Sequence, residues 1–238
     1  MIKFFRHIRK SLIEKNQMGK YFKYAIGEIL LVVIGILIAL QINNWNENKK
    51  TQGNVNTFLS SLESDLNNDL LTITEIIEVQ ENRLKGLKKL ISLGNKSKQN
   101  EILENNKNYQ IDIGRNWTFF PVAGAYKTAS GTGMIENLEN DTLKSEIVNL
   151  YEYYYKRINY VGQINDQRSE LLEWESRKYI DNMITTQRYD GNGLSDKDFL
   201  DQLGFVMRFT GVYVGFANKT KEAIEKTIRT IKIERKEK

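Results

Sequence analysis

A run of twelve consecutive apolar or glycine residues, Ile29–Leu40, constrains this chain more than any other feature. The apolar character extends to Phe22–Ile42 when three polar residues near its ends are included. As a helix with a rise of about 1.5 Å per residue, that stretch is about 31 Å long. The hydrocarbon layer of a bilayer is about 30 Å thick, so we predict a transmembrane helix over residues 22–45.

Two other interpretations of this run are the core helix of a soluble protein and the apolar region of a cleaved signal peptide. The residues after the run, 40–45, contain no small-x-small pair suited to signal peptidase, which favours an uncleaved signal anchor. Aromatic and amide side chains of the kind found at membrane interfaces lie at both ends of the predicted span. They are Tyr21 and Tyr24 on one side and Gln41 and Trp45 on the other.

The positive charge of the chain is concentrated at its N-terminus. The formal net charge is +5, but residues 1–23 contain seven lysines and arginines against Glu14 alone, so the remainder is nearly neutral. A nearly neutral domain lacks the broad basic face that binds nucleic acid, and we therefore exclude nucleic acid as a partner. The positive-inside bias predicts a cytoplasmic N-terminus, a bacterial inner membrane location and a periplasmic C-terminal domain.

The N-terminal tail, residues 1–21, has apolar residues at helical spacing with basic residues between them. Two interpretations stay open for this tail: an amphipathic helix bound to anionic lipid, or a disordered segment that only sets orientation. Either makes membrane lipid a predicted partner.

Small residues predict one face of the span as a packing surface. Gly27, Gly35 and Ala39 share roughly one side of a helix, and small residues allow the backbones of two helices to approach in lipid. Glu28 lies close to this face. It could pair with a basic group of a partner, or its side chain could simply reach toward the headgroups.

Residues 1–50, and especially Tyr24–Glu47, resemble the N-terminus of a bacterial family of membrane-anchored proteins of unknown function. A second stretch, Ala125–Gly131 followed by Ile135–Asn137 and Leu143–Ile147, is similar to a more loosely kept part of that family. The resemblance implies a periplasmic helical domain on an uncleaved anchor. It implies no activity and no catalytic residue.

Beyond a polar juxtamembrane linker, residues 46–54, apolar residues recur with a mean spacing of 3.6 and predict one long helix ending near Gly94-Asn95. Its stripe consists of Val55, Leu59, Leu62, Leu66, Leu70, Ile73, Ile77, Gln80, Leu84, Leu87 and Ile91. Residues 95–120 lack a sustained period and predict a loop whose aromatic residues Trp117, Phe119 and Phe120 cap the bundle.

Pro121 predicts the first turn of a short helix that ends near Ala129, because proline is favoured at that position. Ser130–Gly133 would close this helix before another turn at Met134–Leu138. A phosphate-binding loop is disfavoured, because the glycines are not followed by Gly-Lys-Ser/Thr.

Asp141 is the predicted N-cap of a third helix that extends to about Ile184. The tyrosines of this helix cannot all point to one side, so Tyr151, Tyr153 and Tyr155 are candidates for a surface that binds a partner, as a carbohydrate or peptide platform.

A fourth helix is predicted from Asp196, with apolar positions stepping by four and three residues as in a coiled coil. The stripe consists of Phe199, Leu203, Val206, Thr210, Tyr213, Ala217, Thr220 and Ile224. Gly204, Gly211 and Gly215 on the same helix predict close approach of a neighbouring backbone.

These features predict an all-α protein: one N-terminal transmembrane helix, then a periplasmic antiparallel bundle of about three long helices plus short helices over residues 55–238. The chain has no cysteine, and its single histidine, His7, lies in the tail. We expect no metal site, no cofactor and no enzymatic activity, because carboxylate pairs such as Asp65 and Asp69 or Glu173 and Glu175 are usually solvated on helices.

We expect the domain to be a structural or protein-interaction module that holds a protein partner or further copies of itself. The alternative is a sensor-like ligand-binding domain that signals through a partner.

Overall fold

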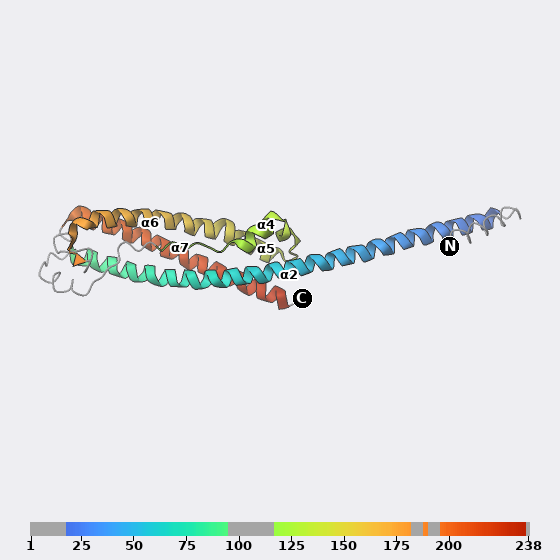
Figure 1. Cartoon of the computed structure of the whole chain (residues 1–238), viewed down its shortest axis with the longest axis horizontal. Coiled ribbons are helices and arrows are strands. Elements are labelled where there is room, and N and C mark those ends of the chain that lie inside the picture. The colour runs from blue at the N-terminus through green and yellow to red at the C-terminus, as the bar shows by residue number, and fades with distance from the viewer. Residues whose placement is uncertain (1–17, 95–116, 182–187, 190–195, 237–238) are drawn as a thin grey trace. The chain divides into compact units, whose positions relative to one another are not determined.

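The computed structural model describes residues 18–94, 117–181, 188–189 and 196–236. The chain divides into two compact units, Met1–Asn54 and Val55–Lys238. Almost all described residues in regular structure are helical, which confirms the all-α class (Figure 1). The helical elements are α2 (Met18–Gly94), α4 (Gly124–Gly131), the 3₁₀ turn η2 (Met134–Asn137), α5 (Asp141–Asn149), the π-helical segment η3 (Leu150–Tyr155), α6 (Lys156–Ser176), the 3₁₀ turn η4 (Arg177–Tyr179) and α7 (Lys197–Lys236). The strands β1 (Ile180–Asp181) and β2 (Arg188–Tyr189) form a two-residue antiparallel pair.

Helix α2 is continuous from Met18 to Gly94. The nine residues that the sequence analysis assigns to a linker, 46–54, are therefore helical. They contain no proline, and Gly53 is the one glycine among them, so nothing in this stretch breaks a helix. Within the first unit every residue of Ile29–Leu40 is exposed. Among the described residues, α2 is the one helix long and apolar enough to span a membrane.

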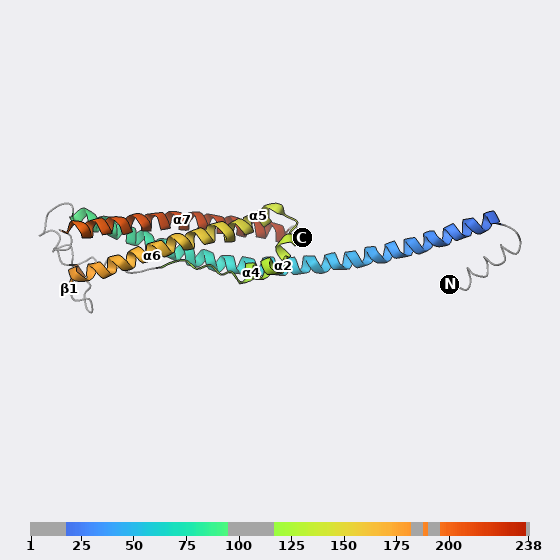
Figure 2. The ribbon, with the colours of Figure 1, turned by 90° about the horizontal axis from the view of Figure 1, so that it is seen from above.

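The second unit is a bundle in which α6 and α7 pack against the later part of α2 (Figures 1 and 2). Two hydrogen bonds show that α2 is parallel to the helix formed by η3 and α6. Asp69 of α2 is bonded to Tyr155 of η3, and Arg83, further along α2, is bonded to Ser169, further along in α6. On α7 residue numbers run in the opposite sense to α2. Arg235, near the end of α7, pairs with Glu63, whereas Phe199 and Leu203, near its start, share a cluster with Leu87 and Leu90. The prediction of an antiparallel bundle is therefore correct for α7 and wrong for α2 and α6, which are parallel.

Polar side chains set the ends of the later helices. The N-cap of α5 is Asn140, whose Oδ1 accepts a hydrogen bond from the Leu143 N–H at 3.0 Å, and not Asp141 as predicted. The start predicted at Asp196 is confirmed to within one residue, because α7 begins at Lys197. Asp196 is its cap: Asp196 Oδ1 accepts a hydrogen bond from the Asp198 N–H at 2.9 Å. The third predicted helix is interrupted by η3, and α6 ends at Ser176. Residues 177–181 form the turn η4 and the strand β1, so the prediction that this helix extends to about Ile184 is wrong. Ile184 itself lies outside the described residues.

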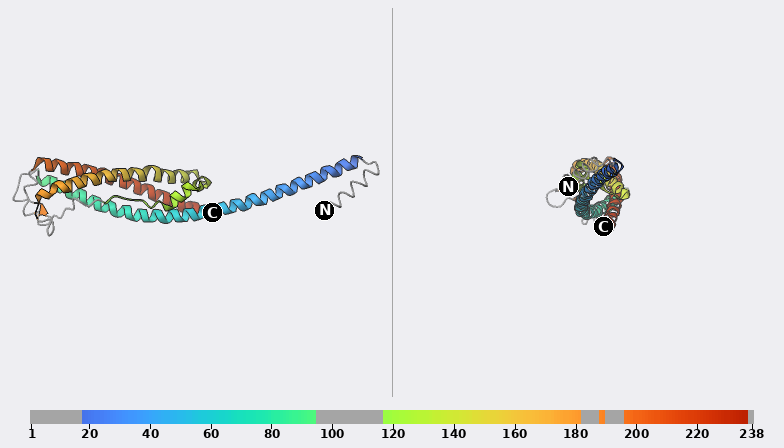
Figure 3. Two further views of the ribbon diagram at one scale, coloured as in Figure 1. Left: turned by 45° about the horizontal axis from the view of Figure 1, so that its top comes forward. Right: turned by 90° about the vertical axis from the view of Figure 1, so that its right-hand side faces the viewer.

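The core contains two hydrophobic clusters. The larger includes Val55–Ile77 of α2 and Tyr213–Ile231 of α7, and the smaller contains Leu87, Leu90, Leu172, Phe199, Leu203 and Val206. Between these clusters the three long helices contribute buried polar residues: Gln80 and Arg83 from α2, Asn165 and Ser169 from α6, and Thr210 from α7. We call these five residues the polar layer. Figure 3 gives a further view of the helices that contribute to it.

Hydrogen bonds connect most of the polar layer. Arg83 donates to the Ser169 hydroxyl at 2.8 Å, and Thr210 donates to Asn165 Oδ1 at 3.1 Å. Gln80 is fully buried, and neither polar atom of its amide has a hydrogen-bond partner within the described part of the chain. An unsatisfied buried amide costs stability, so the layer is less favourable than an apolar one of the same shape.

The predicted helix stripes are largely confirmed. All eight stripe positions of α7 are buried, and on α2 only Leu70, Leu84 and Ile91 are partly exposed. The prediction for the α7 glycines is wrong, because a Cβ built on Gly204, Gly211 or Gly215 would meet no described atom within 4 Å. The close approach occurs at Gly162 of α6, where a Cβ would lie 2.7 Å from the Thr118 methyl group.

Candidate functional site

An extended segment, Trp117–Ala123, lies against the bundle and is held through its backbone. The Phe119 N–H donates to the Tyr213 hydroxyl at 2.8 Å, and the Val122 N–H donates to Asp69 Oδ1 at 2.8 Å. Tyr151 in turn donates its hydroxyl to the Val122 carbonyl at 3.2 Å. Backbone groups of an irregular segment need partners when they are buried, and side chains of α2, η3 and α7 supply them.

Asp69 and Asp65, one turn apart on α2, both accept backbone hydrogen bonds. Asp65 Oδ2 accepts from the Ala125 N–H at 3.1 Å, near the start of α4. Asp69 is buried, and its second oxygen accepts the Tyr155 hydroxyl at 2.6 Å. Burial raises the pKa of Asp69, while the hydrogen bonds from Tyr155 and Val122 oppose that shift. The expectation that this carboxylate pair is solvated is therefore wrong for Asp69, and both carboxylates hold the backbone between Val122 and Ala125 in place.

Three tyrosine rings form a row next to this segment. Tyr126 of α4 stacks on Tyr151 with ring centroids 4.0 Å apart and planes 3° from parallel. Tyr151 meets Tyr155 edge to face at 4.9 Å. The hydroxyls point to fixed partners, and burial raises the pKa of both Tyr151 and Tyr155 well above the ordinary tyrosine value. The hydroxyls of this row therefore stay protonated and engaged with partners inside the domain, and the aromatic rings are the groups available for contact.

Charged groups lie beside the ring row. Tyr126 donates to Glu152 at 3.0 Å, and burial together with Glu152 raises the pKa of Tyr126 to about 12. Glu152 also pairs with Lys156, and the hydrogen bonds from Lys156 and Tyr126 lower its pKa. Lys127 of α4 is exposed and forms no ion pair with a described residue. Lys127 is therefore a cation that can pair with a carboxylate from outside the described residues.

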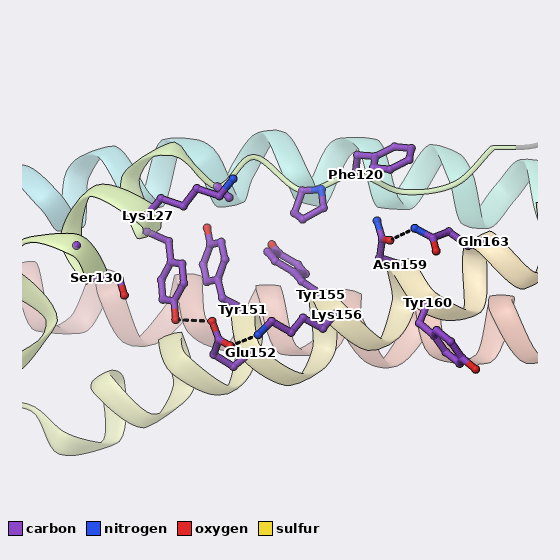
Figure 4. A pocket seen from close by; sticks show the side chains of 14 residues that line it. Phe120, Lys127, Ser130, Tyr151, Glu152, Tyr155, Lys156, Asn159, Tyr160 and Gln163 are labelled. Carbon is purple, nitrogen blue, oxygen red and sulfur yellow. Dashed lines mark hydrogen bonds and ion pairs between the residues drawn. The ribbon is translucent and has the colours of Figure 1, made fainter.

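These residues line an open groove of about 780 Å³ (Figure 4). One wall is formed by Phe120, Pro121 and α4, and the other by η3 and α6 between Tyr151 and Gln163. Figure 4 shows Phe120 and Lys127 on one side and the Asn159–Gln163 amide pair, joined by a hydrogen bond of 2.8 Å, on the other. The volume falls in the range of sites that bind ligands.

The structure separates the three tyrosines that the sequence groups as a candidate partner surface, and a role of any of them in binding stays a prediction. Tyr153 is exposed, whereas Tyr151 and Tyr155 are buried and reach the groove as part of its wall. The π-helical geometry of η3 is the structural feature that was not predicted, and such segments are frequent at functional sites. Trp117 and Phe120 are exposed, so only Phe119 of the three predicted capping aromatics is buried.

The predicted membrane residues lie in the first unit. Gly27, Gly35 and Ala39 are exposed, and a Cβ on either glycine would meet no described atom within 4 Å. Glu28 is half-buried. At the predicted interfaces Tyr24, Gln41 and Trp45 are exposed, with the Lys49 ammonium 5.5 Å from the Trp45 ring. The side chain of Tyr21 and the tail up to residue 17 lie outside the described residues. A role of this helix in association stays a prediction.

The chain matches a family described as "Family of unknown function (DUF6090)" over residues 28–213. The match covers the apolar part of α2, the groove and most of the bundle. Comparisons with curated proteins and with solved structures found no match. The chain belongs to the DUF6090 family, as the resemblance noted in the sequence implied.

Proposed function

We propose that this family member is a single-pass protein of the bacterial inner membrane whose domain, Val55–Lys238, is a protein-interaction module on the periplasmic side. The observation that carries the anchor is the exposure of the apolar stretch of α2. An 18-residue window of this helix is apolar enough to cross a bilayer, and none of it is buried within the protein. Apolar surface of that extent is unfavourable in water and favourable in lipid.

The distribution of charge supports the proposed orientation. Seven basic residues precede position 24, and the rest of the chain is nearly neutral. An excess of lysine and arginine beside a span favours retention of that side in the cytoplasm. A reporter enzyme that works only outside the cytoplasm is expected to be active when it is fused after Lys238. Activity of a fused reporter that works only in the cytoplasm would contradict this orientation.

The groove supports the proposed interaction role. It is lined by aromatic rings, and aromatic residues are enriched where proteins recognise partners. Phe120 and Tyr160, both groove residues, are 68% and 58% exposed, so most of each ring is accessible to a partner. The described ring row and the extended segment hold the walls in a fixed geometry, which reduces the entropy lost on binding.

Site-specific photocrosslinking in native membranes tests this role. A photoreactive phenylalanine analogue at Phe120 is expected to give a discrete crosslinked product with a protein partner. The matched control is the same analogue at Tyr153, which is 54% exposed but does not line the groove. The proposal fails if Phe120 yields only uncrosslinked chain, or if both positions give the same products.

The alternative function is a sensor-like domain that binds a small metabolite, and the volume of the groove favours it as the second candidate. A ligand present at a hundred times its Kd would stabilise the domain by about 2.7 kcal/mol. Thermal unfolding of the full chain in detergent micelles against a metabolite collection separates the two candidates. A metabolite that raises the Tm in the intact protein, but not in the Phe120→Ala protein, would favour the sensor.

A further inference from the structure

We propose that the groove binds an extended, proline-containing polypeptide segment that bears an acidic side chain. This inference rests on the proposed interaction function and names the chemistry of the partner.

The length of the groove suits an extended segment. Its second wall runs along the helix from Tyr151 to Gln163. With a rise of about 1.5 Å per residue this wall is about 18 Å long. A polyproline II segment advances about 3.1 Å per residue, so about six of its residues span the wall. A compact metabolite would contact only part of it.

The hydrogen-bonding capacity of the wall favours a segment with few donors. The hydroxyls of Tyr126, Tyr151 and Tyr155 are already engaged by Glu152, Val122 and Asp69. A glycan would bring many hydroxyls whose desolvation this wall does not compensate. Proline residues have no N–H to satisfy, and their rings pack on aromatic faces as in other aromatic-lined peptide grooves.

The domain already binds a segment of this kind from its own chain. Residues 117–123 form neither helix nor strand, include Pro121, and contact Tyr151 and Tyr155 of the groove. The Val122 carbonyl accepts from Tyr151, and the Phe119 ring lies 5.6 Å from the Tyr155 ring. The amide pair Asn159 and Gln163 on the open side of the groove supplies groups for the carbonyls of a second extended segment.

The charge of the groove indicates the acidic side chain. Lys156 is paired with Glu152, but Lys127 has no ion pair among the described residues. Both lysines line the groove. A carboxylate in the bound segment would complete the charge balance at Lys127, and it would favour an acidic over a basic peptide.

A peptide array tests the inference with the full chain in detergent micelles. The array holds decapeptides with zero to six prolines and one glutamate, lysine or alanine, together with a linear hexasaccharide of N-acetylglucosamine. Binding is expected to increase with the number of prolines and to be strongest with glutamate. Binding that is independent of proline content, or stronger to the hexasaccharide than to every peptide, overturns the inference.

Variants then locate the binding. Phe120→Ala and Tyr160→Ala each remove an exposed ring, so the fold is retained, and each should weaken peptide binding by about tenfold. Tyr153→Ala is the matched control and should leave the Kd within about twofold. Lys127→Gln should remove the preference for glutamate. Equal affinities of the Phe120→Ala and Tyr153→Ala proteins contradict the assignment to the groove.

The two proposals fail separately. If the analogue at Phe120 captures a protein while the array shows no dependence on proline, the interaction function stands and the chemistry of the partner is different. If neither experiment gives groove-dependent binding, both proposals fail.

Discussion

Replacing Gly162 by alanine tests the packing between α6 and the extended segment. An alanine Cβ would lie 2.7 Å from the Thr118 methyl, 3.0 Å from the Thr118 hydroxyl and 3.1 Å from Tyr213 Cε2. Neither neighbour can move freely, because Thr118 is hydrogen-bonded to Asp166 and the Tyr213 hydroxyl accepts from the Phe119 N–H. Overpacking of this kind costs about 1–3 kcal/mol, and three close contacts place it near the upper value.

Helix propensity acts in the opposite direction, since alanine is favoured over glycine in a helix interior by about 1 kcal/mol. The net expectation for Gly162→Ala is a loss of about 2 kcal/mol, which lowers the Tm by about 4–8 °C for a domain of this size. The control is Gly215→Ala on α7, where no described atom lies within 4 Å of the new Cβ. In that variant only the higher helix propensity of alanine acts, which stabilises the domain by about 1 kcal/mol and should raise the Tm by about 2–4 °C.

Both variants are compared with the unmodified full chain by far-ultraviolet circular dichroism in the same detergent. The opposite signs are the critical result, because a general effect of alanine would move both variants in one direction. A Gly162→Ala protein as stable as the Gly215→Ala protein would refute the close packing inferred at Gly162.

Three further outcomes follow from the polar contacts. Gln80→Leu is expected to raise the free energy of unfolding by about 1–3 kcal/mol in urea titrations, because it removes a buried amide without hydrogen-bond partners; a destabilised variant would contradict this. Burial raises the folded-state pKa of Asp69 above its ordinary value of 3.8, so its stabilising contribution is complete below that pH and is lost as the pH rises through the raised pKa. The stability of the unmodified protein relative to Asp69→Asn should therefore increase as the pH is lowered, and a pH-independent difference would argue against the shift. Asn140→Ala should cost about 1 kcal/mol as the loss of an N-cap, and more than Asp141→Ala, in thermal unfolding.

Helix periodicity predicted α7 well, because the spacing of apolar residues within one or two turns is enough to show which positions of the helix are buried. The spacing from Phe199 to Ile224 is enough to identify the buried face, and Asp196 is a cap that its own sequence neighbourhood determines. The same reasoning located the long helix after Val55. It missed that this helix continues from the apolar segment, because polar residues 46–54 fit a linker and a solvated helix equally well.

The groove could not be predicted from the sequence, because it depends on which helices are neighbours. Asp69 lies one residue before Leu70, a member of the predicted apolar stripe, yet it is buried since Tyr155 and the Val122 N–H meet it there. Tyr151 and Tyr155 are buried on the inner face, where their hydroxyls donate to the Val122 carbonyl and to Asp69. A density of tyrosines is visible in the sequence, but the face that each one occupies is set by these distant contacts.

The position of the polar layer has a consequence for how the bundle opens. It lies between the two apolar clusters, so the small cluster around Phe199, Leu203 and Val206 is separate from the large one. Regions with fewer buried apolar contacts open at lower free energy, as separate cooperative units. Amide protons on α7 before Thr210 should therefore exchange with solvent sooner than those after it, and the domain would unfold in two steps starting from the Phe199 end.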